Sequence, residues 1–151
     1  MKFIVDVMLG RLATWLRLIG HDVLFDRNMD DRQLIRCARE QERTIITRDT
    51  GLARRRAAAR YCIFIRSDRV IDQLAEMKQL LCSTDKPLHG RCARCNGELE
   101  CVEKSDEIGD GIPDYVYHAH DRFLRCSTCA KIYWEGSHYR HMKRTLQQVL
   151  R

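Results

Sequence analysis

Four of the eight cysteines in this chain form two Cys-x-x-Cys pairs in its last third, Cys92 with Cys95 and Cys126 with Cys129. Two such pairs can complete a tetrahedral shell of thiolates around one zinc ion, with each sulfur about 2.3 Å from the metal. A loop can span the long segment between the pairs. Because these ligands leave no coordination position open, we predict a structural zinc site and not a catalytic one.

Disulfide bonds are the main alternative to zinc. The chain begins Met1-Lys2-Phe3-Ile4-Val5-Asp6, where a carboxylate comes too early for the apolar segment of a secretory signal. We therefore expect a cytoplasmic protein, in whose reducing surroundings paired cysteines usually bind metal or carry out redox chemistry. A redox site would need only one pair, so zinc is favoured. No apolar run approaches the roughly 20 residues that a membrane span requires, and we expect no membrane partner.

Aspartates form the second group of candidate residues. Asp6 and Asp49 each follow a short apolar segment that is typical of a buried strand, and Asp30 and Asp31 stand before a helical pattern. In an open parallel sheet, ligands bind beyond the carboxyl ends of the strands, where we expect these side chains. Carboxylates that gather there repel one another, so a cluster is most stable around a hard divalent cation such as magnesium or manganese. Beside a basic surface, a metal held in this way suits phosphodiester hydrolysis.

Each aspartate also has a simpler interpretation. In this interpretation, Asp30, Asp31 and Asp49 are simply helix caps, and Asp22 is expected to be a turn residue. Asp6 is harder to explain in this way, because a carboxylate that directly follows a buried strand needs a compensating partner. Spacing alone leaves both interpretations open.

The elements that must position these residues alternate along the first part of the chain. Apolar segments predict strands at residues 2–6, 22–25, 44–47 and 61–65. Helical spacing predicts helices at residues 9–19, 32–42, 51–60 and 70–81. Gly20 is expected to cap the end of the first helix, and Ser67 or Asp68 the start of the last. This order predicts an α/β fold in which a parallel sheet has helices on both faces.

The remaining residues are expected to form a second unit. We divide the chain into residues 1–85 and 86–151, with a linker at 84–88. Short strands are expected at residues 99–103, 123–124 and 132–134, and a final helix at 141–150. The segment 103–121 is polar and acidic and contains Gly109, Gly111 and Pro113, so we predict a long flexible loop there.

The charge of the chain is basic. It carries 27 Lys and Arg against 21 Asp and Glu, a formal net charge of +6. The basic excess consists mostly of arginine, which suits recognition of phosphate. Charge alone fits a solvated surface on a soluble protein equally well.

Several segments together resemble the Mut-seven C-terminal ribonuclease family. The opening of that family is similar to KFIVD at residues 2–6, LGRLA at 9–13 and WLRLIG at 15–20. Its later acidic motifs are similar to residues 30–31 and 47–49, and its zinc ribbon to residues 91–97, 126–129 and 132–138. The resemblance spans nearly the whole chain and is specific in combination.

The resemblance implies a PIN-like nuclease fold: a three-layer α/β arrangement with a parallel sheet flanked by helices, followed by a small zinc ribbon and a C-terminal helix. It implies a ribonuclease that hydrolyses RNA with magnesium or manganese. Asp6 and Asp49 match the strand-end acids of PIN-like nucleases and would hold the metal, and Asp30 or Asp31 would supply the next ligand. Asp68 is a candidate for a fourth acid.

We expect the RNA backbone to be held by arginines near the same edge or on the adjoining helix. These are Arg11, Arg17 and Arg48. The zinc ribbon would extend the RNA-binding surface or brace the nuclease fold. The alternative is a non-catalytic RNA-binding or ribosome-associated adaptor, in which the basic surface binds RNA and the aspartates are caps. A phosphatase-like or nucleotide-binding enzyme is disfavoured, because no Gly-rich phosphate loop follows any expected strand.

Overall fold

The computed structural model describes residues 1–81, 90–105, 108 and 112–150. The linker expected at residues 84–88 lies outside this part of the chain. Among the described residues, no helix combines the length and the apolar character that crossing a membrane requires.

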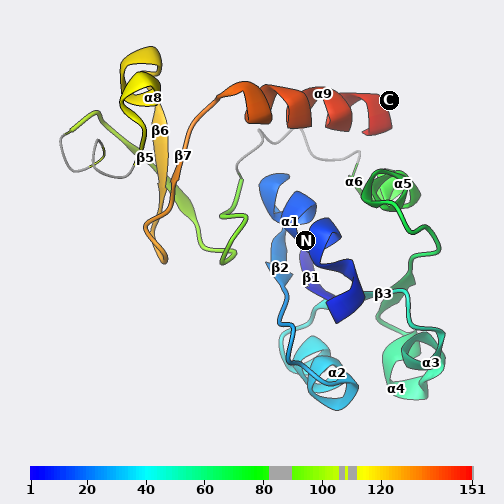
Figure 1. Cartoon of the computed structure of the whole chain (residues 1–151). Coiled ribbons are helices and arrows are strands. Elements are labelled where there is room, and N and C mark those ends of the chain that lie inside the picture. The colour runs from blue at the N-terminus through cyan, green and yellow to red at the C-terminus, as the bar shows by residue number, and fades with distance from the viewer. Residues whose placement is uncertain (82–89, 106–107, 109–111, 151) are drawn as a thin grey trace.

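A four-stranded parallel sheet organises the first part of the molecule (Figure 1). Its strands are β1 (Lys2–Val5), β2 (Asp22–Leu24), β3 (Thr44–Thr47) and β4 (Cys62–Phe64), in the order β2-β1-β3-β4. The central strands are continuous apolar runs, because helices cover both faces of the sheet and both sets of side chains are buried. The parallel sheet and its flanking helices confirm the α/β prediction.

Alternate side chains of the sheet enter two separate cores. Phe3 and Val5 belong to the core under four helices, and Ile4 belongs to the core on the opposite face. The first set of helices is α1 (Gly10–Leu18), α5 (Val70–Glu76), α6 (Lys78–Leu81) and α9 (Ser137–Leu150). The second set is α2 (Asp31–Glu40), α3 (Thr50–Arg54) and α4 (Arg56–Ala59). A short 3-10 helix, η1 (Val7–Leu9), leads from β1 into α1.

Two of the expected helices are interrupted. The helix predicted at 51–60 divides into α3 and α4 at Arg55, whose backbone is extended with φ −65° and ψ 126°. The helix predicted at 70–81 divides into α5 and α6 at Met77. Gly20, by contrast, ends α1 as predicted, with a φ of 97° and its N–H bonded to the Arg17 carbonyl.

The predicted cap of the last of these helices is wrong. Arg69 occupies the N-cap position of α5, and no side chain caps this helix end. The turn before α5 is instead fixed by Glu76, whose carboxylate accepts the backbone N–H groups of Arg66 and Ser67 at 2.9 and 2.8 Å. Asp68 is thereby left to pair with another side chain, Arg48.

A second, antiparallel sheet follows, with β6 (Phe123–Cys126) between β5 (Leu99–Val102) and β7 (Ile132–Tyr133). The prediction of a loop throughout residues 103–121 is wrong, because helix α8 (Asp114–Ala119) lies within that segment. Val116 of this helix is buried against Phe123 of β6, and Pro113 stands at its N-cap. The sequence pattern missed α8 because it has little more than one turn and shows no repeated apolar spacing.

Helix α9 returns the chain to the first sheet. It contacts α5 and α6, and Leu146 is buried in the core that α1 and α5 also line. In Figure 1 this helix extends across the top of the view from β7 toward α5. The antiparallel sheet is therefore flanked in sequence by segments that pack on the parallel sheet.

Candidate functional site

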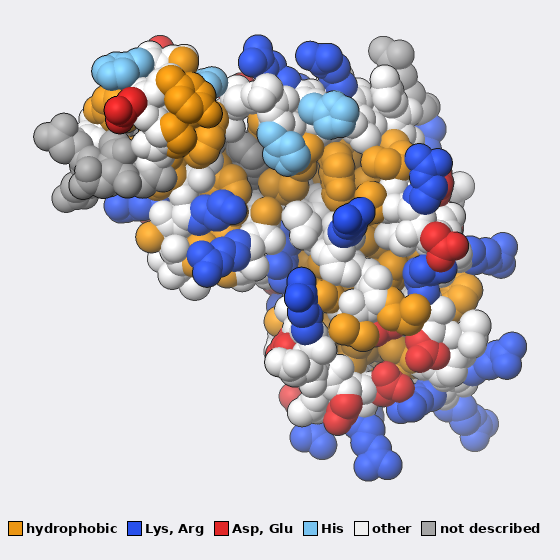
Figure 2. Space-filling model, viewed as in Figure 1, with side chains coloured by type: hydrophobic (Ala, Val, Ile, Leu, Met, Phe, Trp, Pro, Cys, Tyr) orange, Lys and Arg blue, Asp and Glu red, His pale blue; other side chains and the backbone are white. Residues whose placement is uncertain are grey.

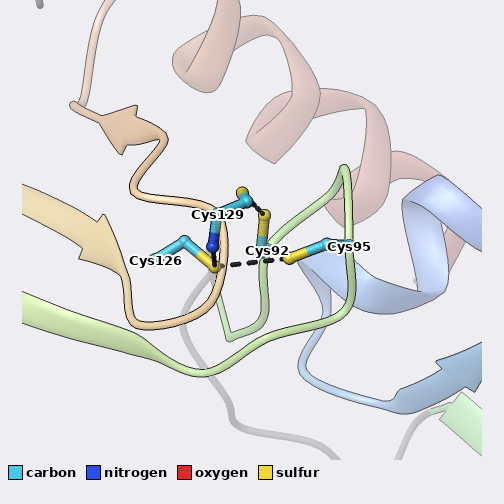
Figure 3. Close-up of side chains that lie close together, drawn as sticks. All are labelled: Cys92, Cys95, Cys126 and Cys129. Atoms are coloured by element: carbon cyan, nitrogen blue, oxygen red, sulfur yellow. Dashed lines mark hydrogen bonds between the residues drawn. The ribbon is translucent and has the colours of Figure 1, made fainter.

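The four cysteines of the two pairs converge at one point. The Sγ atoms of Cys92, Cys95, Cys126 and Cys129 all lie within 4.8 Å of one another, and Figure 3 shows them pointing toward a common centre. The Sγ–Sγ distance is 3.6 Å from Cys92 to Cys129 and 3.4 Å from Cys95 to Cys126. A tetrahedral zinc–thiolate site places its sulfurs about 3.8 Å apart, whereas a disulfide requires about 2.05 Å. The donor set therefore fits a zinc ion.

The surroundings of the cluster support thiolate ligands. Cys92 is fully buried, and burial by itself raises the pKa of its thiol. Hydrogen bonds from the Tyr133 hydroxyl, 3.1 Å away, and from the backbone of Cys95 and Arg94 outweigh burial and lower that pKa to about 6. The Tyr133 hydroxyl also accepts the N–H of Ala93 at 3.1 Å. Tyr133 thus orients a candidate ligand from behind, as partners beyond the ligands commonly do at metal sites.

Each Cys-x-x-Cys pair with its turn is called a knuckle here, the first at residues 92–96 and the second at 126–130. Gly97 is required because the two knuckles approach each other closely. A Cβ atom at this position would lie 2.6 Å from the Thr128 hydroxyl oxygen and 2.8 Å from the Cys126 sulfur. Only a residue without a side chain allows the second cysteine pair to come this near. The Cys-x-x-Cys spacing alone does not reveal this requirement.

Asp6 and Asp49 lie at the carboxyl edge of the parallel sheet and are connected through Thr47. The hydroxyl of Thr47, which is fully buried, donates to Oδ2 of Asp6 at 2.7 Å and accepts the backbone N–H of Asp49 at 2.9 Å. Asp6 is itself only 6% exposed, as expected for a carboxylate directly after a buried strand. Because β1 and β3 are neighbours in the sheet, these residues are brought together from opposite ends of the segment 6–49 of the sequence.

Both carboxylates keep an oxygen free for a ligand. Among the described residues, no donor is bonded to Oδ1 of Asp6, whose Oδ2 takes the Thr47 hydroxyl. Asp49 caps α3 through Oδ1, which accepts the N–H groups of Gly51 and Leu52 at 2.6 and 3.1 Å. Its Oδ2 has no such partner within the same residues. Magnesium is commonly held by one or two carboxylates and completes its shell with water and substrate phosphate, so each of these free oxygens is a chemically suitable ligand for such an ion.

Asp30 and Asp31 do not join Asp6 and Asp49 in one tight cluster. Within the described parts of the chain, the cysteine set is the one group of three or more candidate ligands close enough to share a metal. Asp30 caps α2 in a reciprocal pair with Gln33, each side chain accepting the other's backbone N–H at 2.8 and 2.9 Å. Asp31 forms an ion pair with Arg55 at 2.7 Å. The capping interpretation therefore describes Asp30, and Asp31 faces a cation.

Arg11, Arg48 and Asp68 surround the same edge of the sheet. Arg48 follows β3 and pairs with Asp68, which follows β4. Arg11 and Asp68 both line a surface hollow of about 420 Å³ between α1 and the start of α5. Asp68, the candidate fourth acid, is thus neutralised by an arginine at the edge.

The prediction that Arg17 contacts RNA requires correction. Arg17 is only 6% exposed. Its Nε donates to the carbonyl of Val23 at 3.0 Å, and its Nη1 donates to the carbonyls of Ala93 and Arg94 at 3.2 and 3.1 Å. The guanidinium therefore fastens the first cysteine knuckle onto α1 and β2 and has no surface from which to reach a phosphate.

Asp22 and Asn96 complete this connection, and sequence reasoning missed both. Asn96 accepts the N–H of Val23 at 2.8 Å and donates to Asp22 at 2.7 Å. Asp22 also holds Arg43 through both carboxylate oxygens, at 2.9 and 3.2 Å. Because β2 is an edge strand, Asn96 pairs a backbone N–H that the sheet leaves open. Asp22 is thus not a simple turn residue, and its partner 74 positions away carries no local sequence signal.

Comparison with known proteins identifies one family. A family model described as Mut7-C RNAse domain matches residues 1–146. No curated protein and no solved structure matches the chain. The matched residues include both the carboxyl edge with Asp6 and Asp49 and the four-cysteine cluster.

Proposed function

The chain belongs to the Mut7-C RNAse domain family, which indicates a nuclease-type function, and from this premise we propose that it is a metal-dependent ribonuclease that hydrolyses RNA phosphodiester bonds at the carboxyl edge of the parallel sheet. The observation that carries the proposal is the Asp6–Thr47–Asp49 arrangement, in which two carboxylates each keep one oxygen free. We also propose that the fold is PIN-like, on the basis of its parallel sheet with helices on both faces.

Asp6 and Asp49 would hold magnesium or manganese, which when bound activates water and stabilises charge on the phosphate. Thr47 fixes the orientation of both residues through its two hydrogen bonds. The capping bonds of Asp49 hold its carboxylate in place before any ligand arrives. Arg11, which lines the hollow of about 420 Å³, and Arg48, which follows β3, would bind phosphate oxygens of the substrate, and Asp31 in the first turn of α2 would border the same edge.

A structural zinc ion in the four-cysteine cluster would brace the antiparallel sheet, and this ribbon would aid RNA binding. A hollow of about 520 Å³ beside the ribbon supports the second role. Its lining includes Tyr115, which is 75% exposed, and Trp134, together with the cations Lys131 and Arg140. Aromatic faces next to basic side chains are the features that bind unpaired bases and their phosphates.

The proposed division into residues 1–85 and 86–151 assigns α9 to the second unit. The packing of α9 on α5 and α6 makes it a brace between the two units. Because residues 1–85 supply the carboxyl edge and residues 86–151 supply the hollow beside the ribbon, we propose that RNA contacts both units.

The test of the proposed function is the cleavage of single-stranded RNA by Asp6→Asn and Asp49→Asn variants. Asparagine preserves the shape of each side chain and the acceptor oxygen that Thr47 and the α3 N-terminus need, but it removes the charge that holds a metal. Activity with magnesium or manganese should fall at least about 100-fold while the circular dichroism spectrum stays unchanged.

Asp121→Asn is the matched control, because the side chain of Asp121 is 94% exposed and lies far along the sequence from the carboxyl edge. It should cleave like the unaltered protein. An Asp6→Asn protein with full activity would reject the site. An unaltered protein that binds RNA but cleaves none with either metal would favour the adaptor alternative.

A further inference from the structure

One surface hollow has a lining that includes none of the residues of the two sites discussed above. It has a volume of about 710 Å³ and is formed by the outer side of α2 and the segment that joins α3 to α4. Four arginines line it: Arg32, Arg36, Arg39 and Arg55. We call this hollow the arginine groove. In Figure 2, Lys and Arg side chains gather at the lower end of the molecule, over α2, α3 and α4.

The arginine groove carries positive charge that the protein does not neutralise. Arg55 forms an ion pair with Asp31. Within the described residues, however, no carboxylate oxygen lies within 4.0 Å of Arg32, Arg36 or Arg39, and all three are exposed. Glu40 is the only acidic residue in the lining. Guanidinium groups that converge without counter-charges repel one another, so an anion bound among them would be stabilised.

The spacing of the three unpaired arginines favours an extended anion. Residues 32, 36 and 39 are four and three positions apart, so they project from one side of α2. From Arg32 to Arg39 the helix rises about 10 Å, which exceeds the size of a single phosphate group. An anion with several charges in a row fits this line better than a small one.

The groove begins at the carboxyl edge. Arg32 follows Asp31 in the first turn of α2, whose N-terminus lies at that edge, and Arg39 stands in the last turn. The Asp31–Arg55 pair joins the first turn of α2 to the residue between α3 and α4, and Asp49 caps α3. A strand with one phosphate at Asp6 and Asp49 can therefore continue directly into the groove.

We propose that the arginine groove binds the sugar-phosphate backbone of the RNA strand that extends from the carboxyl edge, which rests on RNA being the substrate there. Guanidinium groups bind phosphate oxygens in pairs, and they do so independently of sequence. The lining contains no aromatic side chain, so the groove reads backbone and not bases. Ile35 and Ala57 are its only apolar residues, which leaves no deep pocket to anchor a side chain of an acidic protein.

The test measures binding of a fluorescent single-stranded RNA as a function of salt, with no magnesium or manganese added. Binding is thus independent of cleavage. The groove variant replaces Arg32, Arg36 and Arg39 together with glutamine. These side chains are exposed and make no ion pair with the described residues, so the fold should be kept. Each phosphate contact on a single strand contributes about 0.7 to the slope of log K against log salt, so the slope should flatten by about 2.

The control variant removes the same charge elsewhere. Arg122→Gln with Lys143→Gln and Arg144→Gln changes three exposed cations at the start of β6 and on α9. Its slope should stay within about 0.7 of that of the unaltered protein. An equal loss in both variants would show that only net charge matters, and an unchanged slope in the groove variant would place the RNA elsewhere. Either result overturns the proposal.

Two further comparisons identify the occupant and separate this proposal from the proposed function. Single-stranded DNA of the same sequence should compete as well as RNA, because the groove contacts the backbone. Competition by polyglutamate at equal charge, lost in the groove variant, would assign the groove to an acidic protein partner and reject an RNA backbone. In cleavage assays the groove variant should raise KM and leave kcat unchanged. An unaltered protein that cleaves nothing but shows the slope difference would reject the nuclease and support the groove.

Discussion

At the scale of single residues, Asp22 connects the two sheets. Asp22→Asn removes a charge that holds Arg43 through two oxygens and receives the Asn96 amide. Charge-assisted hydrogen bonds that are partly buried are worth about 1–3 kcal/mol, so we expect the free energy of unfolding in urea to fall by about that amount. Asp121→Asn, at a side chain that is 94% exposed, should change it by less than about 0.5 kcal/mol. Equal values for the two variants would contradict this role.

The contribution of Asp22 also has a defined pH dependence. Burial raises the pKa of its carboxyl, but hydrogen bonds from Arg43 and Asn96 outweigh burial and lower it below the ordinary value of 3.8. A group whose pKa is lowered by folding stabilises the protein above its unfolded pKa, and this stability is lost as the pH falls through the folded pKa. The stability gap between the unaltered protein and Asp22→Asn should therefore be constant near neutral pH and close only below about pH 4.

Tyr133 is expected to support zinc binding although it is not itself a metal ligand. In Tyr133→Phe the ring remains, but the hydroxyl that bonds Cys92 and Ala93 is lost. Groups that orient metal ligands from behind typically contribute 10–100-fold to metal affinity, and we expect zinc binding to weaken by about this factor. Competition with a chromophoric chelator measures it. Tyr115→Phe, at a ring that is 75% exposed, is the control and should bind zinc like the unaltered protein.

At the scale of elements, α9 contributes a buried side chain to one core of the parallel sheet, although it lies outside the segment that forms that sheet. Leu146 is 6% exposed and packs in the same core as Leu12 and Leu74. Leu146→Ala removes buried apolar volume and should lower the free energy of unfolding by about 2–5 kcal/mol. Gln147→Ala on the exposed side of the helix should have little effect. If both variants unfold at the same urea concentration, α9 does not stabilise the parallel sheet.

Elements whose signals are local could be predicted from the sequence. The apolar runs of β1 and β3, the α2 start at Asp30 and the α1 end at Gly20 each depend on neighbouring residues, and all are present. The position of Asp6 and Asp49 at one edge also followed, because parallel strands align their carboxyl ends. The paired cysteines predicted their own convergence.

Features that depend on distant partners could not be predicted. Arg17 stands on a helix next to the carboxyl edge, and only the folded chain brings the carbonyls of Ala93 and Arg94 to its guanidinium. The break at Arg55 separates α3 from α4 where local propensity favours one continuous helix, and Arg55 then pairs with Asp31 of α2. In both cases tertiary contacts override or redirect a correct local pattern.

At the scale of the whole molecule, the four-cysteine cluster and the edge of the parallel sheet form one connected structure. The first knuckle contributes Asn96, which accepts the Val23 N–H, and its backbone carbonyls receive Arg17. A Cβ on Gly90 would lie 2.3 Å from the Cα of Gly20, so the backbones approach as closely as glycine permits. The knuckle therefore covers the β2 edge that would otherwise be open to pairing with another chain.

Removal of zinc should for this reason also loosen β2, which lies outside the ribbon. Without a metal, the four thiolates lose the ion that holds the knuckles together, and Asn96 is released from β2. Hydrogen exchange of the Val23 amide should then accelerate by at least about tenfold after chelation, because it loses its acceptor. The Ile46 amide, deep in the sheet, should accelerate only as far as global stability falls. If Val23 exchanges at the same rate with and without zinc, the knuckle and the sheet are independent, and loss of the metal from the ribbon does not affect the parallel sheet.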